Sequence, residues 1–171
     1  MQDVNVVVVF YSRTGSTEKM ALAAAVGAVE GKANIRLRRI PEIAGDEAIA
    51  TVPGWKENHD RMSWEYIAPR EADMLWAEGL IVAIPDWLSL SSPEVKSYLD
   101  GLAGKDALAG KKLAGKFAAA LGPGGLDQAL NAAGLTVVPP ATGADAAECA
   151  RLAGVRVADA VRAEKFGVPS H

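Results

Sequence analysis

Four hydroxyl-bearing side chains lie within six residues, directly after the first apolar run of the chain. The segment is Ser12-Arg13-Thr14-Gly15-Ser16-Thr17, and it separates the apolar run Val4–Tyr11 from a helix-forming sequence that begins at Ser16. A buried strand, a tight turn and a helix N-terminus direct backbone N–H groups and the positive end of the helix dipole toward one point. Hydroxyl groups can donate to phosphate oxygens, and a glycine lets the backbone approach a ligand closely. The segment therefore predicts a phosphate-binding loop.

The same turn lacks the patterns of other phosphate-binding loops. It contains no Gly-x-Gly-x-x-Gly, which argues against a dinucleotide, and no Gly-Lys-Ser/Thr, which argues against a P-loop. A loop that surrounds phosphate with hydroxyl groups rather than a lysine suits a ligand with one phosphate and no metal. The alternative interpretation is an ordinary strand-to-helix turn with N-capping hydroxyl groups. The density of hydroxyl groups directly after the first strand favours the ligand.

Length, charge and cysteine content limit the class of protein. The chain has 171 residues, which suits a single domain over residues 1–171 with a sizeable core. Its net charge of −3 argues against nucleic acid as the main partner, because that partner requires a concentrated basic surface. The single cysteine, Cys149, excludes an internal disulfide and a cysteine-based metal site from this chain alone. Cys149 lies on a helical apolar stripe, which favours a core position.

Two kinds of targeting segment are missing from the sequence. The first residues show no basic region followed by an apolar stretch, so we expect no signal peptide. No uninterrupted apolar segment approaches the ~20 residues that a transmembrane helix needs, so we expect no membrane span. The expected location is the cytoplasm.

Apolar runs alternate with helical patterns along the chain, which is typical of a parallel sheet covered by helices. The expected strands are 4–11, 34–40, 79–85, 112–121 and 135–138, and the expected helices are 16–30, 92–102, 126–133 and 144–164. This succession predicts an α/β fold with a three-layer, doubly wound, five-stranded parallel sheet in the flavodoxin-like strand order 2-1-3-4-5. Right-handed crossovers then place the loops after the first, third and fourth strands at one edge. We expect the ligand there.

The segment from Pro41 to Pro69 is the exception to this alternation. It is long and irregular, and it holds aromatic side chains such as Trp55 and Trp64 among charged residues. Loops of this length are uncommon in compact domains and are often functional. Two interpretations stand: a functional loop, or a surface excursion that packs on its own aromatic residues or on another subunit. His59, in the same segment, is either a proton donor or a solvated side chain.

Several segments together resemble one branch of the flavodoxin-like proteins, the NAD(P)H:quinone oxidoreductases of the tryptophan-repressor-binding-protein type. The resemblance spans nearly the whole chain and rests on Ser12–Thr17, Arg39-Ile40-Pro41-Glu42, Glu71-Ala72-Asp73, the glycine-rich segment at 122–125, and Pro139-Pro140. It is specific in the first loop and looser elsewhere. The resemblance implies FMN as the cofactor, NAD(P)H as the electron donor, a quinone-like molecule as the acceptor, and assembly into a homodimer or homotetramer.

The sequence departs from this family after the third strand. The family has Thr-Pro-Thr-Arg-Phe-Gly there, whereas this chain has Ile84-Pro85-Asp86-Trp87-Leu88-Ser89-Leu90-Ser91. The phosphate end of FMN is therefore better supported than the ring end. Two alternatives to the oxidoreductase stay open: a flavodoxin-type one-electron carrier, and a flavodoxin-fold binding protein that has lost the flavin ring site.

The resemblance implies cofactor contacts and no catalytic acid–base residue, because the flavin itself supplies the redox chemistry. The expected cofactor-binding residues are Ser12, Arg13, Thr14, Gly15, Ser16 and Thr17 at the phosphate, and Pro85, Asp86, Trp87, Leu88, Ser89, Gly122, Gly124 and Gly125 around the ring. Trp87 either contacts the ring or fills the end of the third strand. Arg13 either pairs with the phosphate or is solvated. The basic residues Arg36, Arg38 and Arg39 either attract the 2′-phosphate of NADPH or form a solvated strand end.

Overall fold

Five parallel strands form the central sheet in the computed structural model, which describes residues 3–103 and 113–167. The strands are β1 (Asn5–Phe10), β2 (Asn34–Arg39), β3 (Gly79–Ala83), β4 (Phe117–Leu121) and β5 (Thr136–Val137). Their spatial order is β2-β1-β3-β4-β5, and each neighbouring pair is parallel. The predicted α/β fold and its strand order are confirmed.

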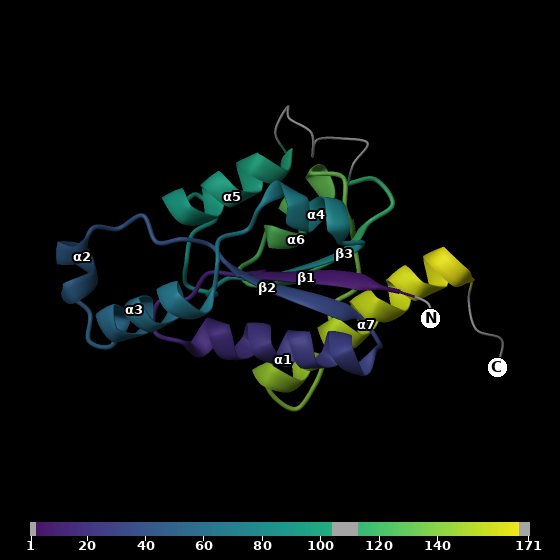
Figure 1. Ribbon diagram of the computed structural model, residues 1–171, viewed down its shortest axis with the longest axis horizontal. Helices are drawn as coiled ribbons and strands as arrows, with labels where there is room; N and C mark the ends of the chain where they lie inside the picture. The colour runs from purple at the N-terminus through teal and green to yellow at the C-terminus, as the bar shows by residue number, and fades with distance from the viewer. Residues whose placement is uncertain (1–2, 104–112, 168–171) are drawn as a thin grey trace.

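Helices cover both faces of this sheet (Figure 1). One face carries α1 (Ser16–Glu30) and α7 (Ala146–Phe166), and the other carries α4 (Glu71–Trp76), α5 (Pro93–Ala103) and α6 (Leu126–Ala132). Two further helices, α2 (Asp46–Ala50) and α3 (Trp55–Glu65), lie beyond the end of the sheet at which β1 ends. Because all strands are parallel, this end is the carboxyl edge, where open α/β sheets bind ligands.

The strand β1 is apolar throughout because both of its faces are covered. Val6 and Val8 belong to the core under α1 and α7, whereas Val7 and Val9 belong to the core under α4, α5 and α6. Each of the four is at most 1% exposed. The alternation of side chains along a strand thus divides one apolar run between two cores.

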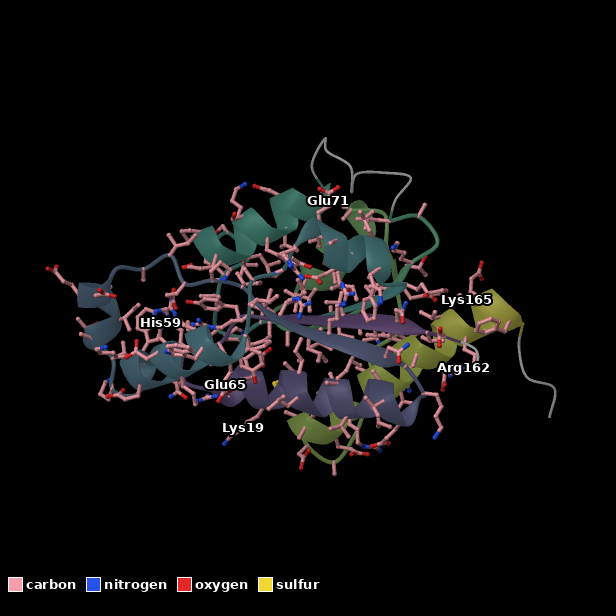
Figure 2. The ribbon with its side chains drawn as sticks, in the orientation of Figure 1. Lys19, His59, Glu65, Glu71, Arg162 and Lys165 are labelled. Atoms are coloured by element: carbon pink, nitrogen blue, oxygen red, sulfur yellow. The ribbon has the colours of Figure 1, made fainter. Side chains whose placement is uncertain are left out.

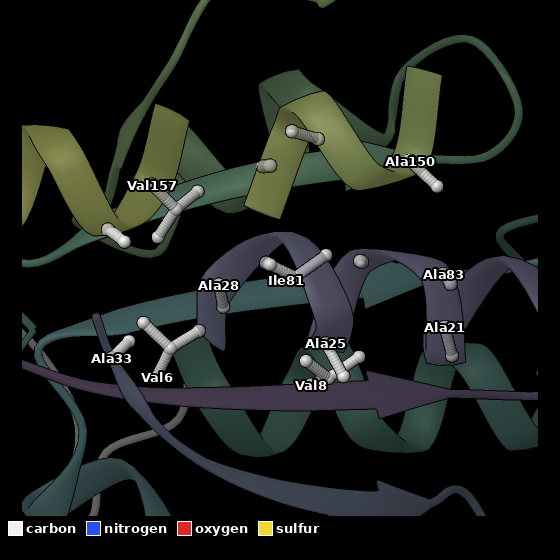
Figure 3. Packing of buried hydrophobic residues seen from close by; sticks show 14 of the residues in the cluster. Val6, Val8, Ala21, Ala25, Ala28, Ala33, Ile81, Ala83, Ala150 and Val157 are labelled. Carbon is white, nitrogen blue, oxygen red and sulfur yellow. The ribbon is translucent and has the colours of Figure 1, made fainter. Parts of the chain in front are cut away.

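Helices α1 and α7 pack closely because small residues line their contact (Figure 3). A Cβ added to Gly27 would lie 1.8 Å from the carbonyl oxygen of Arg151, and one added to Gly154 would lie 2.0 Å from the carbonyl oxygen of Ala24. Alanines such as Ala28 fill the space beside these glycines. This close contact fixes α1, and with it the loop at its N-terminus, against the sheet.

The segment 41–69 is partly helical, so the expectation of one long irregular loop is wrong. It contains both α2 and α3. Of the residues of α3, only Trp55 and Met62 are buried, two helical turns apart, and the rest of the helix is mainly polar. An amphipathic pattern needs more apolar positions than this to be recognised in a sequence. The helix is stabilised instead by the groups against which it packs.

The last two strands are shorter than the sequence indicates. The predicted fourth strand began at Lys112, which lies outside the described residues, and β4 begins only at Phe117. Residues 113–115 form a turn instead, with Gly115 at a φ of +82°. The strand β5 has two residues, and the N–H of Val138 after it still donates to the carbonyl of Ala118 in β4 over 2.8 Å. These differences leave the carboxyl edge unchanged.

Candidate functional site

The loop between β1 and α1 is closed by a hydrogen bond between its own residues. The N–H of Gly15 donates to Oγ of Ser12 over 3.1 Å, and Ser12 is 1% exposed. Gly15 is the N-cap of α1 and has a φ of +99°, which favours glycine. A glycine N-cap has no side chain that could accept from the first N–H groups of the helix. These donors and the positive end of the helix dipole are therefore available to an anion.

The remaining hydroxyl groups of this loop differ in exposure. Thr14 and Ser16 are exposed, whereas Thr17 is buried. The side chains of Thr14 and Ser16 are therefore open to a ligand, while the hydroxyl oxygen of Ser12 accepts a hydrogen bond within the loop. The strand, turn and helix that the sequence predicts are all present here. Phosphate binding by this loop stays a prediction.

Helix α3 packs against the start of α1 through polar groups. Both terminal nitrogens of Arg61 donate to the carboxylate of Glu18, and the hydroxyl of Tyr66 donates to the same carboxylate over 2.7 Å. The hydrogen bond from Arg61 lowers the pKa of Glu18, against the effect of burial, and Tyr66 acts in the same direction. Glu18 is thus ionised, and its charge is balanced by Arg61. It adds little repulsion to an anion at the neighbouring loop.

Aromatic side chains surround Arg13. Its Nε donates to the hydroxyl of Tyr11 over 2.8 Å, and its guanidinium carbon lies 4.4 Å from the ring centroid of Trp55 and 5.2 Å from that of Trp87. The hydroxyl of Tyr11 and Nε1 of Trp55 both donate to the carboxylate of Glu42, over 2.7 and 2.9 Å. Burial raises the pKa of Tyr11, so its hydroxyl stays protonated. Arg13 is half-buried in this cluster. The interpretation of Arg13 as a solvated side chain is therefore wrong.

The loop after β3 presents Trp87 at the surface. Pro85 and Leu88 are buried, and the N–H of Leu88 donates to the carbonyl of Pro85 over 3.0 Å, which forms a tight turn. Asp86 and Trp87, inside the turn, are exposed, and Trp87 is 65% exposed. Leu88 is the buried residue here, so Trp87 does not fill the end of the strand. Its indole is available to a flat ligand.

The glycine-rich loop after β4 contacts the loop after β3. A Cβ added to Gly122 would lie 3.0 Å from the carbonyl oxygen of Ile84, and one added to Gly125 would lie 3.3 Å from the side chain of Leu90. A Cβ added to Gly124 would have no heavy atom within 4 Å. Two glycines of this loop therefore permit close packing, and the third borders open space.

The three predicted loops thus meet at the carboxyl edge. Arg13 of the first loop lies over Trp87 of the second, and the second loop contacts the third at Gly122. Ser89 is exposed on the second loop. The sequence did not assign Trp55 to this site. The concentration of aromatic residues in the segment 41–69 is the signal in the sequence that could have indicated it.

Three other candidate residues have structural partners. Arg36 and Arg38 both donate to the carboxylate of Asp73, over 3.2 and 2.9 Å, so neither is a solvated strand end. Burial alone would raise the pKa of Asp73, but the hydrogen bonds from Arg38, from the backbone of Arg70 and from Arg36 lower it overall. Arg39 is 4% exposed and lies beneath the surface. A 2′-phosphate site at this cluster is not supported.

The remaining titratable candidates are also engaged or remote. His59 lies on α3 (Figure 2), with Nδ1 3.2 Å from Nη2 of the buried Arg39. Cys149 is half-buried on α7. Across residues 3–103 and 113–167, no group of three or more His, Cys, Asp or Glu residues is arranged to hold a metal ion. Over the same ranges, every helix is too short or too polar to cross a bilayer.

Comparison with solved structures identifies the fold. A flavodoxin from the domain Archaea superposes with a TM-score of 0.61 at 19% identity, over 93% of this chain and 99% of that one. A flavodoxin from Streptococcus pneumoniae TIGR4 gives a TM-score of 0.60 at 16% identity, over 91% and 98% of the two chains. The chain has the flavodoxin fold. Within this fold, the three loops described above occupy the carboxyl edge of the sheet.

Sequence comparison relates this flavodoxin-fold chain to curated enzymes. An NAD(P)H dehydrogenase (quinone) from Archaeoglobus fulgidus is 32% identical over 96 residues, which are 56% of this chain and 49% of the relative. The protein of the same name from Brucella ovis is 30% identical over 130 residues, which are 74% and 62% of the two chains. The chain thus spans about half to three-fifths of the curated relatives that it matches. No family model matches the sequence.

Proposed function

We propose that this chain binds FMN at the carboxyl edge of its sheet and transfers electrons from NAD(P)H to a quinone-like acceptor. The observation that carries the proposal is that Arg13, two residues before the uncapped N-terminus of α1 at Gly15, lies over the exposed indole of Trp87. One end of this surface suits a single phosphate and the other suits a flat ring.

The curated relatives named NAD(P)H dehydrogenase (quinone) support the same activity. The motifs shared with the tryptophan-repressor-binding-protein type support that branch, and residues 12–17 are the most specific of them. The loop after β3, with Trp87 in place of the family's Arg-Phe-Gly, is where this chain differs. We therefore expect the acceptor preference of this chain to differ from that of the family.

The phosphate end of the proposed site consists of neutral donors and one cation. The N–H groups at the start of α1 and the hydroxyl groups of Thr14 and Ser16 would hold the phosphate. Arg13 adds a positive charge within the same loop, and Tyr11 and Trp55 fix its position. A dianionic phosphate is favoured by this combination of helix dipole and guanidinium.

The ring end consists of an aromatic side chain and a glycine. Trp87 offers its indole, and Gly124 borders open space that a side chain would fill. FMN, when bound, supplies the hydride and electron transfer chemistry. The residues of the chain orient it, cover part of its surface and carry charge near it; Asp86 and Arg13 are the charged groups on the two loops. No side chain is required to move a proton.

We further propose that the chain assembles into a homodimer or homotetramer. Three apolar side chains on the outer surface of α1, Leu22, Val26 and Val29, are 40%, 53% and 50% exposed. Apolar residues gathered on one helix surface are typical of a protein–protein contact. Light scattering of the purified protein tests this proposal, which a monomer at micromolar concentration would contradict.

The experiment for the activity is an absorbance spectrum of the protein after loading with FMN and removal of free flavin, followed by turnover with NADH or NADPH and menadione. We expect a yellow protein whose bound flavin NAD(P)H reduces, and which oxidises NAD(P)H over many turnovers when menadione is present. A yellow protein that NAD(P)H does not reduce would indicate a one-electron carrier. A colourless protein would indicate a binding protein that has lost the ring site.

A matched pair of tryptophan variants sharpens this experiment. Trp87→Ala removes the exposed indole at the site, and we expect weaker flavin retention and slower turnover. Trp64→Ala removes an indole that is 92% exposed on α3, and we expect no change in either quantity. Equal effects of both variants would contradict a ring contact at Trp87.

A further inference from the structure

A cavity lies on the face of the sheet opposite to α1 and α7. It has a volume of about 310 Å³ and is lined by side chains of β1, α4 and α5 and by the chain segments after β2 and before α4. Its apolar wall includes Val7, Val9 and Met74. None of the residues 12–17, 85–89 or 122–125 lines it. The cavity is therefore separate from the proposed FMN site.

The cavity differs from an ordinary packing defect because it contains a buried carboxylate. Glu94, in the first turn of α5, is 5% exposed and lines the cavity. Its Oε2 is buried and has no hydrogen-bond partner among the described residues. An ionised carboxylate without a partner is strongly destabilising in a protein interior. A group that supplies a positive charge or N–H donors from within the cavity would remove this cost.

A second unpartnered polar atom lies one helical turn away. Tyr98 is four residues after Glu94 on α5, so the two side chains share a face of the helix. Tyr98 lines the same cavity. Its hydroxyl oxygen is buried and has no hydrogen-bond partner within the described part of the chain. Burial raises the pKa of Tyr98, so the hydroxyl stays protonated. The cavity thus offers two buried oxygens without partners among the described residues, one of a carboxylate and one of a hydroxyl, on one face of α5.

A second buried acid at the cavity, Asp73, already has hydrogen-bond partners. Asp73 accepts hydrogen bonds from Arg36, Arg38 and the backbone N–H of Arg70. At the exposed mouth, Arg70 and Glu71 carry opposite charges. Glu94 is therefore the one lining acid that is buried and lacks a cation within residues 3–103 and 113–167.

The size and walls of the cavity define the rest of the ligand. A dry apolar cavity of about 150 Å³ is known to hold one benzene ring, and this one has about twice that volume. It is large enough for one or two fused rings. A quinone suits it poorly, because its carbonyl oxygens only accept hydrogen bonds and would face the carboxylate of Glu94.

We propose that this cavity is a binding site for a small aromatic amine, whose ammonium group pairs with the carboxylate of Glu94 and whose rings contact the accessible apolar wall at Pro41 and Ile43. The hydroxyl of Tyr98 accepts a second N–H of the same ammonium group. This site is independent of the proposed redox function, so FMN and the amine bind at the same time.

The experiment is isothermal titration of the full chain with tryptamine, indole-3-propionate and menadione, each with and without saturating FMN. Tryptamine and indole-3-propionate share a ring system and differ in the sign of the side-chain charge. We expect tryptamine to bind at least tenfold more tightly than indole-3-propionate, with an affinity that FMN does not change. Equal binding of the two indole compounds, tightest binding of menadione, or competition between tryptamine and FMN would overturn the proposal.

Variants on α5 locate the binding. Glu94→Gln keeps the shape and removes the charge, and we expect at least a tenfold loss of tryptamine affinity together with an unchanged or raised melting temperature of the free protein. Asp100→Asn, at an exposed acid on the same helix that pairs with Lys96, is the matched control and should leave affinity unchanged. Unaltered tryptamine affinity in Glu94→Gln, or an equal loss in both variants, would show that the amine binds elsewhere and overturn the assignment.

Discussion

The guanidinium carbon of Arg13 lies 4.4 Å from the ring centroid of Trp55, and this contact joins the loop of residues 12–17 to helix α3. The same guanidinium lies over Trp87 of the loop after β3. One cation thus connects three segments that are distant in sequence. The position of Trp87, and with it the ring end of the proposed FMN site, depends on Arg13.

Replacement of Arg13 by methionine tests this dependence. Arg13→Met keeps a linear side chain and removes the cation, and each lost cation–π contact is worth about 0.5–1 kcal/mol. We expect the free energy of unfolding, measured in urea, to fall by about 1–2 kcal/mol. We also expect FMN affinity to fall about tenfold, the equivalent of ~1.4 kcal/mol.

The control for this variant is Arg36→Met. Arg36 lies over the ring of Trp76, 4.1 Å from its centroid, away from the carboxyl edge. The Arg36→Met variant should also be less stable than the wild type, but it should bind FMN with the affinity of the wild type. An unchanged FMN affinity in Arg13→Met would contradict a role for Arg13 in binding FMN.

Much of the fold follows from the sequence because the strands that matter most are buried on both faces. β1 and β3 are continuous apolar runs, and a helical pattern follows β1 directly. The strand order 2-1-3-4-5 could be inferred because it is the flavodoxin-like arrangement of a doubly wound sheet of this size. The strand, turn and helix around residues 12–17 were predictable because these residues are contiguous in the chain, whereas phosphate binding there stays a prediction.

The parts that could not be predicted depend on contacts between distant residues. Helix α3 has too few buried residues to show a helical period, and it is held by Arg61 and Tyr66 against Glu18. The location of Arg13 between Trp55 and Trp87 likewise results from the meeting of three segments. No spacing within any one of these segments encodes it.

Two glycines at the site have different physical roles, and alanine substitutions separate them. Gly15→Ala places a side chain at a φ of +99° and 3.3 Å from Oδ1 of Asn58. We expect the free energy of unfolding to fall by about 1–2 kcal/mol, because the left-handed conformation is strained for alanine. FMN affinity should fall as well, since the loop can no longer close in the same way.

Gly124→Ala provides the contrasting case. A Cβ at this position meets no heavy atom within 4 Å. The stability of the free protein should stay within about 0.5 kcal/mol of the wild type, as for most surface substitutions, while FMN affinity falls because the methyl group enters the space at the ring end. Unchanged FMN affinity in Gly124→Ala would place the ring elsewhere.

The ion pair between Arg61 and Glu18 joins α3 to the start of α1, next to the proposed phosphate loop. Arg61 and Tyr66 are the two side chains described above that donate to the buried carboxylate of Glu18. Arg61→Met leaves Tyr66 as the donor of this pair that remains. We expect the free energy of unfolding to fall by about 1–2 kcal/mol. This is less than for a fully buried ion pair, because water screens the charge of the partly exposed arginine. Lys56→Met removes an exposed pair on the same helix and should cause no measurable loss.

The lowered pKa values of Glu18 and Asp73 predict a loss of stability in acid. A carboxyl group with a lower pKa in the folded state stabilises the protein above its pKa in the unfolded chain, and this stabilisation is lost as the pH falls through the folded-state pKa. Urea unfolding should therefore give a constant free energy from pH 7 to about pH 5 and a decline below the ordinary carboxyl range near pH 4. Glu18→Gln should be less stable at pH 7 and show a shallower decline, and a slope equal to that of the wild type would contradict this assignment.

The most direct test compares the affinities of the chain for FMN and for riboflavin, which differ only in the phosphate. We expect wild-type protein to bind FMN about 100-fold more tightly, or ~2.7 kcal/mol, and the double variant Thr14→Val/Ser16→Ala, which removes the two exposed hydroxyl groups of the loop, to lose most of that difference. Thr142→Val, at an exposed position before α7, should retain it. Equal affinity of the wild-type chain for FMN and riboflavin would contradict a phosphate site at residues 12–17.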